Sequence, residues 1–357
     1  MFGVVRIFWA VCVMVSHLCY PNLIGNYAVY GFYVLSGYLM TLIMHQTYGF
    51  HTRGRIKFAM NRALRLYPMY WAAAVLTLIL IHLIDPASVV KFNPDMYAPA
   101  DVKSVFENAL FIFPSWLSNT VKPRLVPQAW SLTVEMCFYV LICIGVSRTF
   151  VRTMVWFVLS LFYVGLTYYV HAPVDYRYYP IAAASLPFSI GGLLYFFSNN
   201  ADIRSLYMRT KLSTNLLLAV MIINVIVWIS LYQGSMAHMH VVSKLWRYGQ
   251  LGFYINLLLC SGLIFSIIMG GRVAFIGARI DRFIGDLSYP IYLMHWGVGL
   301  LVSFLVFGAP LRGGSPQGIL SLIISMVVIT ILSTALIYLL DRPIQTVRDK
   351  VKSHMEE

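Results

Sequence analysis

Charged residues are scarce in this 357-residue chain: Asp, Glu, Lys and Arg make up 11% of it, against 60% hydrophobic residues. Soluble domains carry about 25% charged residues, so the composition excludes an ordinary soluble domain and indicates a polytopic membrane protein. Acidic residues are especially few, with 13 Asp and Glu against 26 Lys and Arg, a net charge of +13. In a membrane protein such an excess usually lies on the cytoplasmic side, so it does not indicate nucleic-acid binding.

Cysteine is also scarce, and all five cysteines lie in apolar runs: Cys12, Cys19, Cys137, Cys143 and Cys260. None has CxxC or CxxH spacing, so we expect neither a disulfide scaffold nor a zinc site, and we predict no bound metal. Small apolar packing residues are the expected role. The first apolar run is not followed by a small-residue cleavage site, so we expect it to remain as a membrane helix.

Long apolar runs, in contrast, are abundant. A helix needs about 20 apolar residues to span a bilayer. Ten such runs occur, at 2–20, 26–45, 67–84, 129–146, 153–170, 179–197, 213–232, 250–269, 287–307 and 318–340. They predict an all-α, polytopic membrane protein with about ten transmembrane helices. We expect one domain over residues 1–345 and a short cytoplasmic tail, 346–357.

Basic residues gather in alternate connections between these runs, which predicts the orientation. The connections with most Lys and Arg are 53–65, 148–152, 204–211, 272–282 and the tail from 342 to 352. Positively charged loops stay in the cytoplasm, so both termini are predicted to be cytoplasmic. No internal repeat is visible, which disfavours the transporters that are built from inverted repeats.

The first run carries two ionisable residues, Arg6 and His17. Eleven residues at about 100° each bring them to one helical face, roughly 16 Å apart along the axis. Ionisable groups inside a bilayer are costly and usually mark a functional site that faces the bundle interior. The alternative for Arg6 is a side chain that snorkels to the lipid headgroups.

A carboxylate, Glu135, lies in the fourth run within the segment QAWSLTVEMCFYV (128–140). From the predicted orientation, Glu135 and His17 both lie in the outer half of the membrane. An unpaired carboxylate there is costly, so His17 is its expected partner, and a histidine oriented by a carboxylate makes a general base. The alternative is a buried structural Glu135 bonded to Tyr or Trp groups.

Arg62 and Arg65 lie three residues apart at the predicted cytoplasmic end of the bundle, just before Pro68. Such a pair could clamp phosphate or pyrophosphate, or it could simply be the positive-inside signal with lipid headgroup contacts. In the second run, Ser36 and Gly37 lie near the middle, and the glycine gives either close helix packing or room for a thin ligand.

The ninth run reads GDLSYPIYLMHWGV (285–298). Pro290 is expected to break or kink this helix, with Tyr289, Tyr292 and His295 around the kink. A lone histidine in mid-membrane is as often a satisfied packing residue as a functional one, so His295 stays open on this ground.

Together these stretches resemble the acyltransferase-3 family of integral membrane O-acyltransferases, of the bacterial O-antigen or surface-polysaccharide type. The matching residues, in order, are Arg6 with His17, GFYVLSGYL, NRALRLYP, WSLTVE and SYPIYLMHW. Departures are modest: Met136-Cys137 follows Glu135, where relatives often have an acidic residue and Gln, and Asp341-Arg342-Pro343 replaces the commoner Glu-Arg-Pro.

The resemblance implies transfer of an acyl group, usually acetyl, from cytoplasmic acyl-CoA to a hydroxyl of a lipid-linked or exported glycan, at the bacterial inner membrane. It implies that His17 is catalytic, with Arg6 as its partner and Glu135 as the fourth-span carboxylate. Arg62 and Arg65 would match the donor-side arginines.

We assign the passage of the donor arm to Ser36 and Gly37, and contacts with the substrate to Trp130, Tyr292 and His295. The donor is acetyl-CoA or another acyl-CoA, and the acceptor a surface polysaccharide such as O-antigen or capsule. Direct transfer in a ternary complex is preferred over an acylated residue, because VLSGYL around Ser36 is not GxSxG. Alternatives are a small or lipid-linked acceptor, a non-catalytic transporter of glycan or acyl donor, and an inactive scaffold.

Overall fold

The described part of the chain consists of helices and the loops that connect them, with no strand. The structure is a computed structural model that describes residues 2–19, 24–210, 213–236 and 239–353. Its α-helices are α1 (Gly3–Leu18), α2 (Ile24–Ile43), α3 (Thr52–Leu83), α4 (Pro86–Phe92), α5 (Val102–Leu110), α6 (Trp130–Ile144), α7 (Phe150–Tyr169), α8 (Ile181–Asn199), α9 (Ala201–Thr210), α10 (Thr214–Met236), α11 (Met239–Ile268), α12 (Ala278–Phe307), α13 (Pro316–Leu336) and α14 (Arg342–Ser353). Two π-helical turns, η1 (Met44–Tyr48) and η5 (Ile337–Asp341), follow α2 and α13.

Every predicted apolar run falls on a helix, which confirms the all-α fold class. Within the described ranges, eight helical stretches are long and apolar enough to cross a membrane, and a ninth results if α9 and α10, bent by 78°, count as one span. At 16 residues, α1 is shorter than those spans. The predicted run 213–232 is α10, and the last four residues of the predicted tail lie outside the described residues.

Two helices are longer than their apolar runs. The run 67–84 is only the second half of α3, which begins at Thr52 and includes the basic segment. Likewise α12 is 30 residues long and continues through Pro290, so of the expected break or kink the break is wrong. A proline removes one backbone donor, and inside a helical bundle neighbouring groups can satisfy the freed carbonyl.

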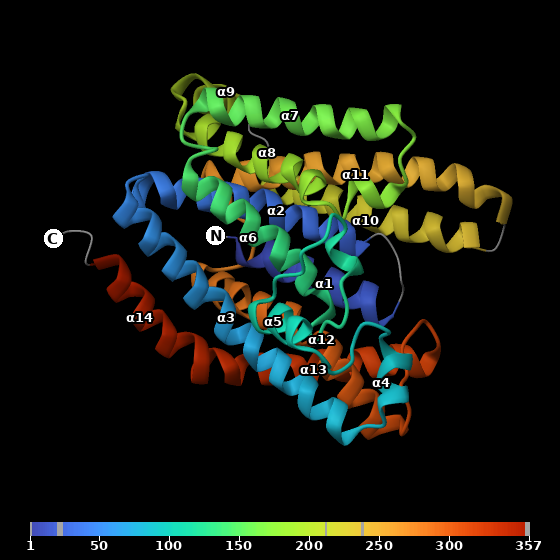
Figure 1. Cartoon of the computed structure of the whole chain (residues 1–357). Coiled ribbons are helices and arrows are strands. Elements are labelled where there is room, and N and C mark those ends of the chain that lie inside the picture. Colours follow the sequence, from blue (N-terminus) through green and yellow to red (C-terminus); the bar gives the residue numbers. More distant parts are fainter. Residues whose placement is uncertain (1, 20–23, 211–212, 237–238, 354–357) are drawn as a thin grey trace.

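The central helices α1, α2, α8 and α12 lie against one another (Figure 1), and glycines lie at their contacts. A Cβ atom at Gly37 of α2 would lie 2.2 Å from the carbonyl oxygen of Phe188 in α8. A Cβ atom at Gly31 would lie 2.4 Å from Trp9, and one at Gly285 of α12 would lie 2.8 Å from Cα of Gly3. These contacts bring α1, α2, α8 and α12 to backbone distance, which is how helices associate without a hydrophobic driving force in lipid.

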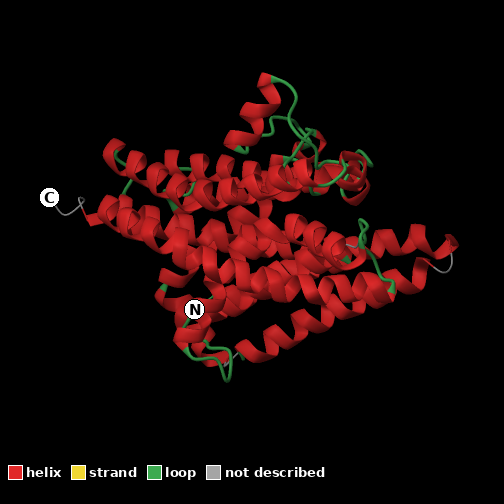
Figure 2. Ribbon diagram, turned by 90° about the horizontal axis from the view of Figure 1, so that it is seen from below, coloured by secondary structure: helices red, strands yellow, loops and turns green. Residues whose placement is uncertain are grey.

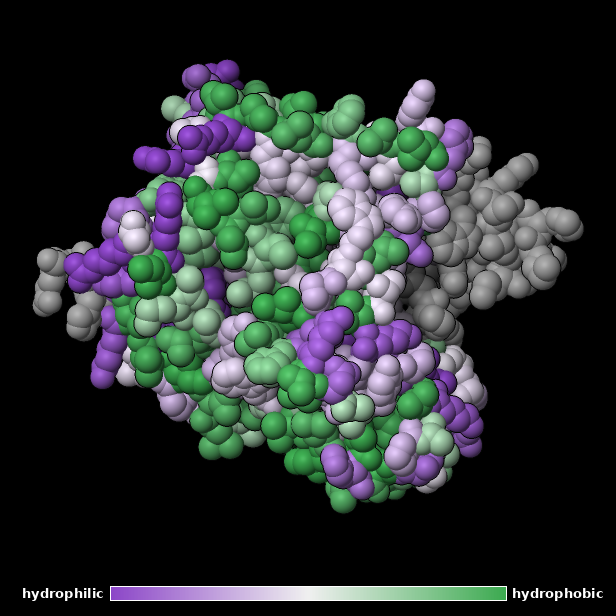
Figure 3. Space-filling model, in the orientation of Figure 1, coloured by the Kyte–Doolittle hydropathy of each residue, from purple (hydrophilic) through white to green (hydrophobic). Residues whose placement is uncertain are grey.

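Apolar side chains also cover much of the outside of the bundle. Figure 3 shows green hydrophobic surface over most of the visible helices, with hydrophilic residues at the left edge beside α9 and α14 and further hydrophilic patches at the centre and lower right. Figure 2 shows the long helices running nearly parallel, with loops mainly at their ends. Exposed apolar residues such as Phe162 (68% exposed) and Leu339 (75%) suit lipid rather than water. The chain is a multi-pass membrane protein.

The register between α1 and α2 determines where the polar residues can meet. The two helices are antiparallel: the Phe2 ring lies 6.2 Å from the Tyr38 ring, and a Cβ at Gly25 would meet Ser16. Ser36 is therefore level with the first turn of α1, and His17 lies at the other end. We call these levels the arginine end, around Arg6, and the histidine end.

Candidate active site

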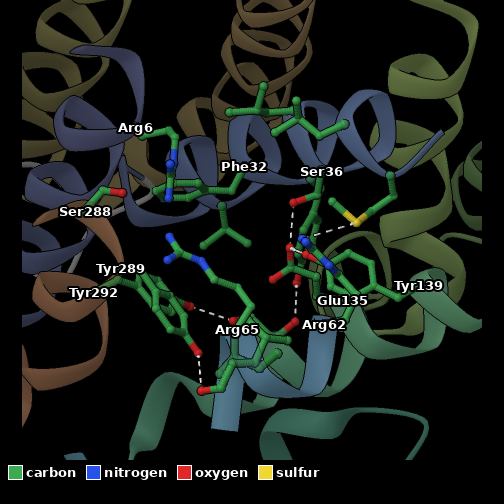
Figure 4. A pocket seen from close by; sticks show the side chains of 18 residues that line it. Arg6, Phe32, Ser36, Arg62, Arg65, Glu135, Tyr139, Ser288, Tyr289 and Tyr292 are labelled. Carbon is green, nitrogen blue, oxygen red and sulfur yellow. Dashed lines mark hydrogen bonds between the residues drawn. The ribbon is translucent and has the colours of Figure 1, made fainter. Parts of the chain in front are cut away.

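The arginine end contains a cavity of about 180 Å³ between α1, α2, α3, α6 and α12 (Figure 4). Its polar lining includes Arg6, Ser36, Arg62, Arg65 and Glu135. These five residues come from four motifs that are far apart in the sequence, so the fold brings the separate motifs to one place. Phe32 and Tyr292 also line the cavity and give it apolar walls.

Glu135 points into this cavity and not toward His17. Its Oε1 accepts a 2.5 Å hydrogen bond from Oγ of Ser36 and a second hydrogen bond from the hydroxyl of Tyr139. The predicted pairing of Glu135 with His17 is wrong, because Glu135 reaches the level of Ser36, about 16 Å along α1 from the histidine. The two donors satisfy a half-buried carboxylate that would otherwise be costly.

The three arginines of the cavity differ in what they already bind. Arg65 forms an ion pair with Asp341, in which Nη1 donates to both carboxylate oxygens at 2.9 and 3.0 Å. Arg62 donates to Oδ1 of Asn61 at 2.9 Å. The guanidinium of Arg6 makes no hydrogen bond with any residue that the structure describes. Arg62 also donates from Nη1 to Sδ of Met40 at 3.8 Å, and Asp341 balances the charge of Arg65. Arg6 thus keeps the most donor capacity for an anion.

The C-terminal segment holds this arginine cluster in place. Asp341 comes from η5, and Arg348 of α14 donates from Nε to Oδ1 of Asn61 at 3.3 Å. The Asn61 amide in turn donates to the backbone carbonyl of Arg348 at 3.1 Å. Sequence reasoning missed these supports, although the Asp341-Arg342-Pro343 stretch was a visible signal.

The histidine end contains a pair of histidines from α1 and α12. His17 Nδ1 lies 2.8 Å from His295 Nε2, and His295 Nδ1 lies 2.8 Å from the carbonyl oxygen of Tyr292. That carbonyl can only accept, so His295 Nδ1 carries the hydrogen and a neutral His295 accepts at Nε2. His17 then donates from Nδ1, which leaves its Nε2 with a free lone pair.

Aromatic residues enclose the pair. The Trp296 ring lies 5.2 Å from the His17 ring, and Phe92 of α4 meets Trp296 edge-on at 5.7 Å. His295 is 0% exposed, whereas His17 is half-buried. A weakly polar surrounding with one open edge suits a neutral imidazole that can take up a proton from a bound group.

The remaining predicted residues are distributed between these places. Ser36 lines the cavity, but Gly37 faces α8, so the structure places it at a helix contact and not on the cavity. Trp130 packs edge-on against Tyr178 and Tyr179 at 5.4 and 5.0 Å, and it is not among the residues that line the cavity. Tyr292 joins the two ends, since its side chain lines the cavity and its carbonyl holds His295.

A family model described as an acyltransferase domain matches residues 2–342, which is nearly the whole chain. The chain belongs to the acyltransferase-3 family. No curated protein and no solved structure matches it.

Membership of the acyltransferase-3 family makes this protein a membrane acyltransferase. Both ends of the site fall within the matched region, so the family assignment applies to the arginine cavity and to the histidine pair alike. Among the described residues, no group of three or more His, Cys, Asp or Glu side chains could hold a metal ion.

Proposed function

We propose that this acyltransferase-3 protein transfers an acetyl group from acetyl-CoA on the cytoplasmic side to a hydroxyl of a surface glycan. The acceptor would be a lipopolysaccharide O-antigen or a capsule, and the membrane the bacterial inner membrane. In this orientation the arginine end faces the cytoplasm and the histidine end faces outward. The basic connections and the basic tail support it.

One observation carries the proposal: two chemically different centres lie on one short helix. Two further arginines, Arg62 and Arg65, line the cavity with Arg6, and a histidine whose Nε2 has no hydrogen-bond partner among the described residues lies eleven residues after Arg6. A donor with phosphates at one end and a thioester at the other would place its charge at the first centre and its reactive carbonyl at the second. The separation, roughly 16 Å, calls for a long thin arm.

The cavity volume indicates which part of the donor can enter. A cavity of about 150 Å³ is large enough for benzene, so the 180 Å³ here admits a thin chain but not a nucleotide. The nucleotide would remain on the cytoplasmic side, at the entrance of the cavity. Arg6 and Arg62 would bind its phosphates there by charge-assisted hydrogen bonds. The pantetheine arm would pass Ser36, Phe32 and Tyr292 on its way to His17.

In the proposed reaction, the acceptor hydroxyl attacks the thioester carbonyl while His17 Nε2 takes the hydroxyl proton. The resulting imidazolium donates from Nδ1 to His295 Nε2, and His295 donates to the Tyr292 carbonyl, so both rings stay oriented. When the carbon–sulfur bond breaks, the proton passes from His17 to the leaving thiolate. One ester and one thiol are formed, and His17 returns to its neutral state.

A second candidate mechanism is a relay through Ser36. The 2.5 Å hydrogen bond from Ser36 Oγ to Glu135 is the arrangement of a hydroxyl beside a base. In that scheme the acyl group would first form an ester at Ser36. We prefer direct transfer, because Ser36 lies a long way from the histidine that would activate the acceptor.

The proposal is tested with membranes from cells that express the chain, incubated with acetyl-CoA labelled in the acetyl group. Labelled glycan should form with the wild type and not with membranes that lack the protein. Proton NMR of the surface polysaccharide would identify the acetylated position. Uptake of glycan or donor without any ester product would instead favour a transporter. A stable acetyl adduct on Ser36 that is consumed by acceptor would favour the relay.

A further inference from the structure

One cation at the histidine end takes no part in the mechanism above. Arg312 lies in the connection between α12 and α13, with its guanidinium carbon 5.3 Å from the centre of the Trp296 ring. Its Nη1 donates to the backbone carbonyl of His17 at 3.3 Å. The next residue, Gly313, donates from its backbone N–H to the carbonyl of Leu18 at 2.9 Å. The guanidinium is thus fixed beside the histidine pair.

Arg312 is exposed and lacks a counter-charge. No Asp or Glu forms an ion pair with it among the residues that the structure describes. In the 85–128 segment, by contrast, Asp95 pairs with both Lys122 and Arg124. Arg312 is therefore a cation oriented by an aromatic ring and a carbonyl, with most of its fork-shaped donor set still free.

Such a cation opposes the proposed chemistry unless something neutralises it. His17 must become an imidazolium during transfer, and a guanidinium packed on the same tryptophan disfavours a second positive charge nearby. An anion bound to Arg312 would remove this repulsion at the moment when the acceptor is in place. The catalytic step would then depend on the charge of the acceptor.

We propose that Arg312 binds an anionic group of the acceptor, a carboxylate or a phosphate, close to the hydroxyl that is acylated. This inference rests on the proposed function, because it places the acceptor at the histidine end. The planar guanidinium fork matches either anion with two parallel hydrogen bonds. The two sources are an acidic sugar within the glycan and the phosphate of a lipid carrier.

The test uses membranes containing wild type, Arg312→Gln or Arg312→Lys, with acetyl-labelled acetyl-CoA and the endogenous acceptor. We expect Arg312→Gln to lower glycan labelling about tenfold, as for loss of a charged hydrogen bond. Arg312→Lys keeps the charge but not the fork-shaped donor set, so its glycan labelling should lie between those of the wild type and Arg312→Gln. Arg204→Gln, a change at an exposed arginine of α9, is the matched control and should label as the wild type does.

The wild-type product gives an independent measurement that needs no variant. Labelled glycan should bind an anion-exchange resin. Mild acid, which releases glycan from a lipid pyrophosphate, then separates the sources: charge that persists indicates an acidic sugar, and charge that is lost indicates the carrier phosphate. A neutral labelled product, or full labelling by Arg312→Gln, overturns the inference and leaves the proposed function standing. No labelled product from the wild type would instead overturn the proposed function.

Discussion

The two ends of α1 differ in almost every physical respect. Around Arg6 the site is ionic, hollow and built from five helices, with arginines partly balanced by Glu135 and Asp341. Around His17 it is aromatic and tightly packed, with a neutral histidine pair. Phosphate binding needs a cluster of positive charges, whereas a general base works best where any nearby positive charge is neutralised. Separating the two along one helix satisfies both needs.

The comparison also predicts how each end responds to mutation. At the histidine end only His17 has the proposed role of base, so its removal should abolish nearly all transfer. The arginine end shares its task among several cations, so a single loss should be partial.

His17→Ala should cause the largest loss, a decrease in transfer of about 10²–10⁴-fold, because it removes the proposed base. Labelled acetyl transfer per unit of membrane protein is the measurement, with immunoblots to show equal levels. His82→Ala is the matched control, since His82 is exposed near the end of α3. Wild-type activity in His17→Ala would show that a group other than His17 takes the proton of the acceptor hydroxyl.

His295→Ala should lower kcat by about 10- to 100-fold, less than the loss of His17, because the base remains but its orientation is no longer fixed. The KM for acetyl-CoA should hardly change, since the arginine end is untouched. His295→Gln, whose amide oxygen can still accept from His17 Nδ1, should recover part of the activity. Equal losses in Ala and Gln variants would argue for a packing role.

Arg62→Ala and Arg6→Ala should each raise the KM for acetyl-CoA about tenfold, with a smaller change in kcat. The reason is the loss of one cation from a cluster in which others remain. The double variant should lose more than either single one. An unchanged donor KM, with a rise in acceptor requirement instead, would contradict the division of the site into two ends.

Asp341→Asn should have a smaller effect, a few-fold rise in donor KM, because Arg65 keeps its position less well without its carboxylate. The ion pair is partly buried, with side chains 18% and 19% exposed, so a lower Tm should accompany the change. Thermal denaturation in detergent and donor titration together measure both effects. A tighter donor affinity would mean that the freed Arg65 itself binds phosphate.

Much of the fold could be predicted from the sequence, because local composition is enough to identify membrane helices. The same local patterns identified Arg6, His17 and Glu135 as unusual. They did not identify the partners: His17 and His295 are 278 residues apart, and Arg65 and Asp341 are 276 apart. Pairing depends on the depth and rotation of each helix in the bundle. The predicted pairing of Glu135 with His17 failed because the depth of Glu135 is known only from its bond to Ser36 and from the register of α2 against α1.

The sequence left two interpretations of Gly37 in the second span: close helix packing, or room for the donor arm. The sequence allowed a passage for the donor arm, but a Cβ atom there would lie 2.2 Å from the Phe188 carbonyl oxygen, which is backbone and cannot move aside easily. Gly37→Ala should therefore cost about 1–3 kcal/mol of stability and lower Tm, as overpacking does.

Folded Gly37→Ala protein should keep its donor KM, because the new methyl group faces α8 and not the cavity. Gly165→Ala in α7 is the matched control: nothing lies within 4 Å of its Cβ position, so Tm should hold or rise. If Gly37→Ala instead kept the wild-type Tm and raised the donor KM, the donor arm would pass between α2 and α8. The boundary of the arginine end would then have to be extended to that contact.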